Sequence, residues 1–311
     1  MLLWQEALGQ KVVGPRRIAV AQLTAVDNET VSGFQEAMAE LGYREGIEVV
    51  YLPTGPLGAV DHLESVIREY LKKSPDLFFV ASTPATQIVK RLTDERSQPP
   101  VVFAPVNDPV GAGIVTNLRR PGGHITGIRL PTGDDLRLRW LLRIAPNAKR
   151  IYLPYTADDK SALASLQQAT DAAARLGVTL LPQAIAGQDD IAAAIAALPI
   201  DADAVFLPRD SRIEARIADF VALADKRRLP ISAPSLTQVK AGALVSYGFV
   251  HREIGRQAAR LADQIFKGTA PGDLPVEMAE SRLAINLATA NRLGITIPDE
   301  VILQAEYVIR K

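Results

Sequence analysis

The stretch RIAVAQL at residues 17–23 is a short apolar run of the kind that forms a buried strand. A helical pattern follows over residues 29–41 and ends at Gly42, a residue well suited to terminate a helix. The next apolar run, IEVVYL, occupies residues 47–52. Strands that alternate with helices of this length are typical of βαβ units with parallel pairing, so the sequence predicts an α/β fold.

The same order of elements occurs a second time. A strand at residues 149–153, a helix over 161–176 that ends at Gly177, and a strand at 178–181 repeat the opening pattern. The offset of roughly 130 residues is too long for a solenoid repeat and suits a duplicated domain. We therefore predict two Rossmann-like lobes with parallel sheets.

The lobes are expected to share the chain rather than follow one another. The turn-rich stretch RPGGHITG at residues 120–127 is the first candidate crossing, and a helix at about 252–266 and a strand at 283–285 come after the second set of elements. Several crossings indicate a multi-strand hinge. The expected units are 16–125 plus about 249–278 for lobe one, 127–247 plus about 279–311 for lobe two, and 1–15 as an N-terminal extension.

Composition excludes several classes of protein. The 35 basic residues balance 35 acidic ones and aromatic residues make up 5%, which argues against a nucleic-acid partner. The chain has no cysteine, so disulfides, thiolate zinc sites and cysteine nucleophiles are excluded. No apolar run is long enough for a membrane span. The start, MLLWQE at residues 1–6, lacks the basic region of a secretory signal, so we expect any export signal to be absent from this chain.

Motifs of catalysis are missing. The glycines of residues 122–127 have the spacing of a phosphate loop, but no lysine follows them, and no nucleophile elbow occurs. The three histidines, His62, His124 and His251, are too widely spaced to indicate a metal site. We therefore predict a protein that is not an enzyme and that uses neither a metal nor a cofactor.

Polar side chains cluster after the predicted strands, where open parallel sheets bind their ligands. Thr83 and Pro84 suit the start of a helix, whose free N–H groups attract a carboxylate, although Thr83 could simply cap that helix. The candidate ligand-binding residues are Gln22, Thr24, Ser82, Thr83, Thr86, Asn107, Asp108, Tyr155, Asp210, Ser235 and Tyr247.

Two pairs among these candidates have a specific expected role. Asp108 or Asp210 could accept a hydrogen bond from an amino or hydroxyl group of the ligand, or each could be an ordinary turn or cap residue. Tyr155 and Tyr247 could bracket an apolar body, or pack between elements. Together the candidates suit a small molecule with an acceptor group and an apolar body, such as an amino acid or a related carboxylate; a sugar is the alternative.

Six short motifs, in this order along the chain, resemble ABC transporter substrate-binding proteins of the group that includes the tryptophan-binding lipoproteins. The resemblance covers essentially residues 17–311. The motifs are LGYREG at 41–46, STPA at 82–85, VNDPVGAGIV at 106–115, RPGGHITG at 120–127, GALVSYG at 242–248 and AINLATA at 284–290.

This resemblance implies a type I periplasmic-binding-protein fold, with the ligand between two lobes joined by a three-stranded hinge. It also implies an ABC permease as partner and a periplasmic or extracellular location, with membrane anchoring in the full-length protein. Asn107 stands where the binders of aromatic amino acids tend to have threonine. We predict the solute-binding component of an ABC importer; the alternative is the ligand-sensing domain of a larger receptor.

Overall fold

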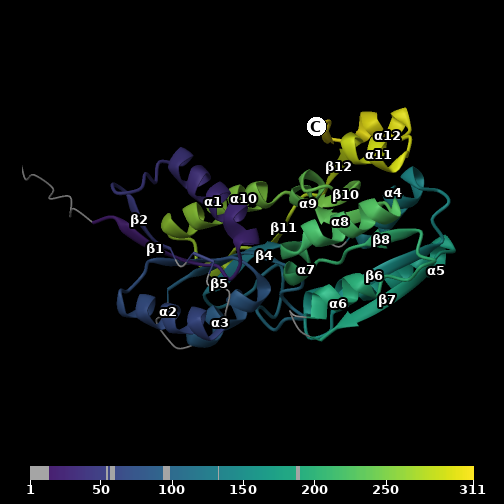
Figure 1. Ribbon diagram of the computed structural model, residues 1–311. Helices are drawn as coiled ribbons and strands as arrows, with labels where there is room; N and C mark the ends of the chain where they lie inside the picture. The colour runs from purple at the N-terminus through teal and green to yellow at the C-terminus, as the bar shows by residue number, and fades with distance from the viewer. Residues whose placement is uncertain (1–13, 54, 57–59, 94–98, 132, 187–189) are drawn as a thin grey trace, which may run out of the picture.

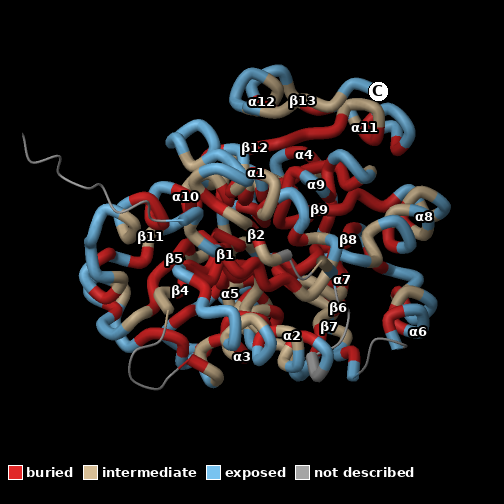
Figure 2. Tube along the Cα trace, turned by 90° about the vertical axis from the view of Figure 1, so that its left-hand side faces the viewer, coloured by how far each residue is buried: buried red, intermediate tan, exposed pale blue. Residues whose placement is uncertain are grey.

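The computed structural model describes residues 14–53, 55–56, 60–93, 99–131, 133–186 and 190–311. Two sheets lie side by side, each covered by helices on both faces (Figure 1). The strands form the buried interior of each half, and the outer turns of the helices are exposed (Figure 2). The predicted α/β fold with two lobes is confirmed. The expected N-terminal extension lies almost entirely outside the described residues.

The sheet of lobe one is six-stranded, with the order β11-β5-β4-β3-β1-β2 and parallel pairing throughout. Its central strands carry continuous apolar runs because helices cover both of their faces. The strands are β1 (Arg16–Ala21), β2 (Val49–Pro53), β3 (Leu77–Val80), β4 (Val101–Val106), β5 (Ile125–Arg129) and β11 (Glu277–Met278).

Four helices cover this sheet. On one face lie α1 (Asn28–Glu40) and α10 (His251–Phe266), and on the other α2 (Val60–Lys72) and α3 (Thr83–Thr93) (Figure 1). The ring of Phe34 in α1 stacks on Phe79 of β3 at 3.9 Å between centroids. Two short 3-10 helices complete the lobe, η1 (Ala25–Asp27) and η2 (Pro271–Asp273).

The sheet of lobe two is seven-stranded, with the order β13-β12-β10-β9-β8-β6-β7. It is parallel except where β12 pairs antiparallel with β10. The strands are β6 (Arg150–Thr156), β7 (Thr179–Ile185), β8 (Ala204–Phe206), β9 (Ile231–Ser235), β10 (Val245–Phe249), β12 (Arg282–Asn286) and β13 (Tyr307–Ile309).

Eight helices surround the second sheet within the described ranges. One face is covered by α4 (Asp134–Ile144), α5 (Lys160–Leu176), α11 (Leu287–Leu293) and α12 (Asp299–Gln304). The other face is covered by α6 (Asp190–Ala196), α7 (Ser211–Ala215), α8 (Ile217–Arg227) and α9 (Leu236–Lys240). Apolar side chains pack from both sets onto the sheet, so each lobe has a core on both sides of its strands.

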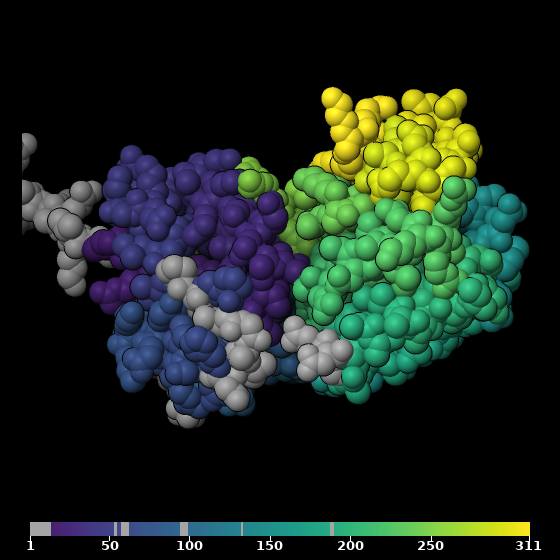
Figure 3. Space-filling view, in the orientation of Figure 1, coloured from purple at the N-terminus to yellow at the C-terminus, as the bar shows by residue number. Residues whose placement is uncertain are grey.

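Within the described residues the chain passes between the lobes at three places: 130–133, 250–251 and 279–281. The first differs from the expectation. β5 pairs with β4 in the sheet of lobe one, so the crossing follows Arg129 rather than residue 125. Gly127 permits this pairing, since a Cβ there would lie 2.2 Å from the carbonyl oxygen of Phe103. A space-filling view shows the two lobes as separate masses that meet along a groove (Figure 3).

Candidate functional site

A cleft lies between the lobes, where the carboxyl ends of the two sheets face each other. It contains about 510 Å³ of space between atoms, including its open mouth. Both lobes and the crossings supply its walls. The residues that line it are Val26, Asp27, Ser82, Thr83, Pro84, Pro105, Asn107, Leu130, Asp159, Ser161, Arg209, Asp210, Ser211, Glu214, Phe249 and His251.

The start of α3 forms part of the cleft wall in lobe one. The helix begins at Thr83, so the position just before the helix belongs to Ser82 and not to Thr83. Ser82 has a positive φ of 80°, a conformation uncommon for a residue with a side chain. Its hydroxyl is buried and has no hydrogen-bond partner among the described residues. A buried donor without a partner carries a free-energy cost, which a ligand oxygen at this place would remove.

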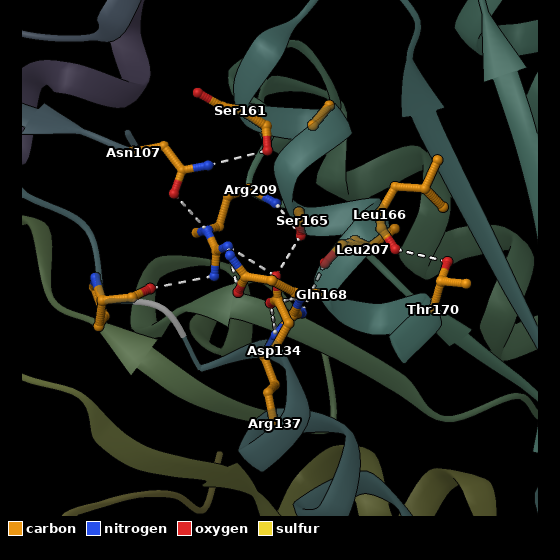
Figure 4. A network of polar contacts seen from close by, with 12 residues as sticks. Asn107, Asp134, Arg137, Ser161, Ser165, Leu166, Gln168, Thr170, Leu207 and Arg209 are labelled. Atoms are coloured by element: carbon orange, nitrogen blue, oxygen red, sulfur yellow. Dashed lines mark hydrogen bonds and ion pairs between the residues drawn. The ribbon is translucent and has the colours of Figure 1, made fainter. Parts of the chain in front are cut away.

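Polar contacts join the two lobes across this end of the cleft. Asn107, which follows β4, donates through Nδ2 to the carbonyl oxygen of Ser161 in α5 at 3.0 Å. Its Oδ1 accepts from Nε of Arg209 at 2.9 Å (Figure 4). The hydroxyls of Thr83 and Ser161 lie 3.5 Å apart. The cleft is therefore closed at this end by direct contacts between lobes.

Arg209 belongs to a buried group of charges in lobe two. Oδ2 of Asp134 lies 2.9 Å from Nη2 of Arg209, and Oδ1 of Asp134 lies 2.8 Å from Nη2 of Arg137 (Figure 4). Burial alone would raise the pKa of Asp134, but the two guanidiniums together hold it below its ordinary value. Burial lowers the pKa of Arg137 to about 10, so it remains protonated at neutral pH. Two cations and one anion leave one excess positive charge, on the guanidinium that faces the cleft.

A second group of charged residues in the cleft lining is acidic. Asp27 of η1 and Glu214 of α7 face each other from the two lobes, and His251 at the start of α10 lies 3.9 Å from Glu214. Burial raises the pKa of Asp27 to about 6; the backbone N–H of Thr24 and the charge of His251 oppose this shift, and the charge of Glu214 adds to it. A cation between these carboxylates would relieve their desolvation and mutual repulsion.

Two other carboxylates in the cleft serve helix starts. Asp210 accepts from the backbone N–H groups of Arg212 and Ile213 at the start of α7, and its second oxygen accepts from Thr156. Asp159 caps α5 in the same way. Burial, and then the negative charge of Asp210, raises the pKa of Asp159. Both side chains line the cleft. Backbone donors engage both oxygens of Asp210 but only Oδ1 of Asp159.

Residues 17–309 match the family described as ABC transporter substrate binding protein. The chain belongs to this family of substrate-binding proteins. The tyrosine-binding protein of Clostridioides difficile is 25% identical over 283 residues, which cover 90% of this chain and 81% of that relative.

Two solved structures are similar over nearly the whole substrate-binding protein. A conserved domain protein from Vibrio cholerae has a TM-score of 0.87 at 27% identity, covering 94% of this chain and 99% of that one. An ABC domain from Streptococcus pneumonia in complex with L-Trp also has a TM-score of 0.87, at 25% identity, covering 95% and 100%. These similarities confirm the predicted family and fold.

The structure brings four of the predicted residues of this substrate-binding protein together in the cleft: Ser82, Thr83, Asn107 and Asp210. Of the two roles considered for Asp210, the structure shows the one of a helix cap. The hydroxyl of Thr86 is also used internally, since it donates to the carbonyl oxygen of Ser82 at 2.7 Å.

Like Thr86, three further candidates of lobe one lie outside the cleft lining. Gln22 donates to Oδ1 of Asn28 at 2.7 Å, and the hydroxyl of Thr24 donates to Asp27 at 3.3 Å, so both support the wall from behind. Asp108 is exposed and accepts from the backbone N–H of Gly111, as a turn residue does. Of the two roles considered for Asp108, the structure shows the one of a turn residue.

Of the two roles considered for the tyrosines of lobe two, the structure shows packing between elements. Tyr155 is partly buried against the core cluster beneath α4 and α5, and Tyr247 packs against Trp140 at 6.3 Å between ring centroids. Ser235 caps α9 and donates to Oε1 of Glu214 at 2.7 Å, so it orients a cleft carboxylate from outside. The apolar walls come instead from Val26, Pro84, Pro105, Leu130 and Phe249.

Sequence reasoning missed the acidic side of the cleft. Asp27 and Glu214 lie in short helical turns after strands, where a carboxylate usually caps a helix. His251 begins α10, and its position at a crossing was the one signal that could have marked it.

Within the described residues no group of three or more His, Asp or Glu side chains could hold a metal ion, and no helix has both the length and the apolar character to cross a membrane.

Proposed function

We propose that this substrate-binding protein captures an amino acid with an apolar side chain and presents it to an ABC permease outside the cytoplasm. One observation carries the proposal: side chains of both charges line the cleft. Arg209 and the start of α3 supply a cation and hydrogen-bond donors, which we call the donor end, and Asp27 and Glu214 supply carboxylates, which we call the acidic end. A zwitterion matches both ends at once.

The carboxylate of the ligand belongs at the donor end. The hydroxyl of Ser82 has no partner there among the described residues, and Thr83 at the start of α3 lines the same cleft. The excess positive charge on Arg209 favours an anion further, because a buried unbalanced charge is costly. Donors from both lobes would then contact one carboxylate.

The ammonium belongs between Asp27 and Glu214. Asp27 receives its hydrogen bonds from Thr24 through one oxygen, Oδ2, and Glu214 is oriented by Ser235. An ammonium has three donors and can reach carboxylates on both lobes at once. Its charge would stabilise the ionised form of Asp27, which burial disfavours.

The side chain of the ligand belongs against the apolar wall of Pro84, Pro105, Leu130 and Phe249. Two similar proteins agree with this chemistry: one is a tyrosine-binding protein, and the structure of the other is a complex with L-Trp. A neutral sugar would leave the excess charge on Arg209 unbalanced. We propose no catalysis, because the hydroxyl at the donor end, that of Ser82, has no base as hydrogen-bond partner among the described residues.

Isothermal titration with a panel of L-amino acids tests this proposal. We expect saturable binding of L-tryptophan or L-tyrosine, with tryptamine and indole-3-propionate bound much more weakly because each lacks one of the two charges. Binding of a sugar from a parallel panel, or equal binding of the amino acid and both analogues, would overturn it.

A further inference from the structure

The contact between Asn107 and Arg209 joins the lobes without any ligand. Nε of Arg209 donates to Oδ1 of Asn107 at 2.9 Å, and the two residues are only 6% and 5% exposed. Nη1 of Arg209 also donates to the carbonyl oxygen of Pro131, which lies in the first crossing, at 3.3 Å. Arg209 of lobe two therefore contacts both lobe one and the hinge.

Asp134 fixes the orientation of this guanidinium. Its Oδ2 lies 2.9 Å from Nη2 of Arg209 and accepts from the hydroxyl of Ser165 at 2.7 Å. Ser165 in turn accepts from the backbone N–H of Arg209 at 3.4 Å, so side chain and main chain of Arg209 are held by the same small group (Figure 4). Asp134 is 1% exposed and is not among the residues that line the ligand cleft.

Asp134 is itself held rigidly. Its Oδ1 accepts from Nε and Nη2 of Arg137, which donates through Nη1 to the carbonyl oxygens of Leu207, just after β8, and Ser232, near the start of β9. The guanidinium of Arg137 stacks over Phe206 at 3.7 Å. The sheet of lobe two is thereby connected through Arg137 and Asp134 to the one guanidinium that crosses to Asn107.

We propose that Asp134 is a positioning residue for ligand binding, which acts by holding Arg209 as a latch on Asn107 and so stabilises the closed lobes before any ligand enters. The expected effect of Asp134 on affinity rests on the proposed function. The latch does not, because all of its contacts are between groups of the protein itself. A binding protein whose competent state is more populated has a higher apparent affinity for its ligand. Asp134 would thus tune affinity from outside the cleft.

The latch is tested first in ligand-free protein. The chain lacks cysteine, so Val110→Cys and Leu163→Cys give two unique sites for spin labels, one on each lobe; these side chains are 43% and 42% exposed. Double electron–electron resonance then reports the distance between the lobes near the latch. We expect a short distance in the labelled parent and a population at longer distance after Asp134→Asn or Asn107→Ala. Asn107→Ala leaves the buried ion pairs of Asp134 with Arg137 and Arg209 intact. It therefore still tests the latch if Asp134→Asn fails to fold.

A matched control is Asp201→Asn, which removes an exposed aspartate paired with Arg150 at 2.8 Å, far from the latch in the bonding network. We expect its distance distribution to equal that of the parent. Identical distributions for the parent, Asn107→Ala and Asp134→Asn would overturn the proposal, whether or not any amino acid binds.

The effect on affinity is tested by a double-mutant cycle with L-tryptophan, or with L-tyrosine where that binds more tightly. Each single variant should bind on the order of tenfold more weakly, as expected for a lost hydrogen bond to a charged group. The double variant should lose little more than either single one, because both break the same latch. Additive losses would mean that Asp134 and Asn107 affect binding independently, which would contradict the latch. If the parent does not bind either amino acid, the proposed ligand class is wrong. The latch is then tested by the distance measurement alone.

Discussion

Gly33 of α1 lies directly against the backbone of Arg252 in α10: a Cβ at Gly33 would be 2.0 Å from the carbonyl oxygen of Arg252. Gly255 makes the reciprocal approach, where a Cβ would be 2.0 Å from the carbonyl oxygen of Thr30. Because of this close packing, η1 with Asp27 and the first residue of α10, His251, meet at the same edge of the cleft. The geometry of the acidic end thus depends on two glycines that the ligand never touches.

Gly33→Ala should destabilise the protein by about 1–3 kcal/mol, since an extra methyl group must push two helices apart. Chemical denaturation measures the loss, and ligand titration should show weaker binding as Asp27 and His251 separate. Gly14→Ala is the control, because no described residue lies within 4 Å of a Cβ at that position. Equal stability of the two variants would contradict the close contact.

Asp27 should make the protein less stable as pH rises. Its pKa is about 6 in the folded protein against 3.8 for the ordinary carboxyl, so the folded state binds this proton more tightly than the unfolded state does. The stabilisation is complete below pH 3.8 and is lost between there and pH 6, up to about 3 kcal/mol. Asp27→Asn cannot ionise, and its free energy of unfolding relative to the parent should rise over that window.

The measurement is urea denaturation of both proteins at intervals from pH 3.5 to about pH 7, with the variant minus the parent plotted against pH. Taking the difference removes the contribution of the other carboxyl groups, which both proteins share. A difference that stays constant across the series would show that Asp27 is not held in its neutral form.

Asp210, the cap of α7, and Glu214 within α7 should have different roles: Asp210 stabilises the fold, and Glu214 binds the ligand. Asp210→Ala removes a cap whose oxygens accept three backbone N–H groups, so stability should fall by about 2 kcal/mol with little change in amino-acid affinity. Glu214→Gln keeps the acceptor for Ser235 but removes the charge, so affinity should fall by about tenfold or more. Titration and melting temperature on both variants distinguish the roles, and the reverse assignment would refute the ammonium end.

Local patterns were enough to predict the fold. Apolar runs and helix-ending glycines repeat along the chain, and Gly177 does end α5 in the left-handed conformation that this reasoning requires. β5 was missed because PGGH at residues 121–124 has the composition of a turn, and the strand that follows is identified only by its pairing with β4. Pairing between distant segments has no local signal.

The candidate site was only partly predictable, because the direction of a side chain at a strand end depends on the last paired residue. Tyr155 is one residue before the end of β6 and points into the core. Asp134 and Arg137 lie in an amphipathic helical pattern, in which charges usually face solvent, yet both are 1% exposed. They are buried because Arg137 donates hydrogen bonds to the carbonyl oxygens of Leu207 and Ser232 in lobe two. The sequence of α4 alone does not reveal these contacts.

Ser82→Ala provides the most direct test of the donor end. The hydroxyl of Ser82 is buried without a partner, so its removal costs the ligand-free protein no hydrogen bond and should leave the melting temperature unchanged or slightly higher. The same change should weaken binding of L-tryptophan or L-tyrosine by about threefold to tenfold, the loss of one neutral hydrogen bond. Ser235→Ala is the matched control: that hydroxyl caps α9 and bonds Glu214, so the control should melt lower. If Ser82→Ala instead melts as low as Ser235→Ala and binds the amino acid as tightly as the parent, the hydroxyl serves the fold and the carboxylate end must lie elsewhere in the cleft.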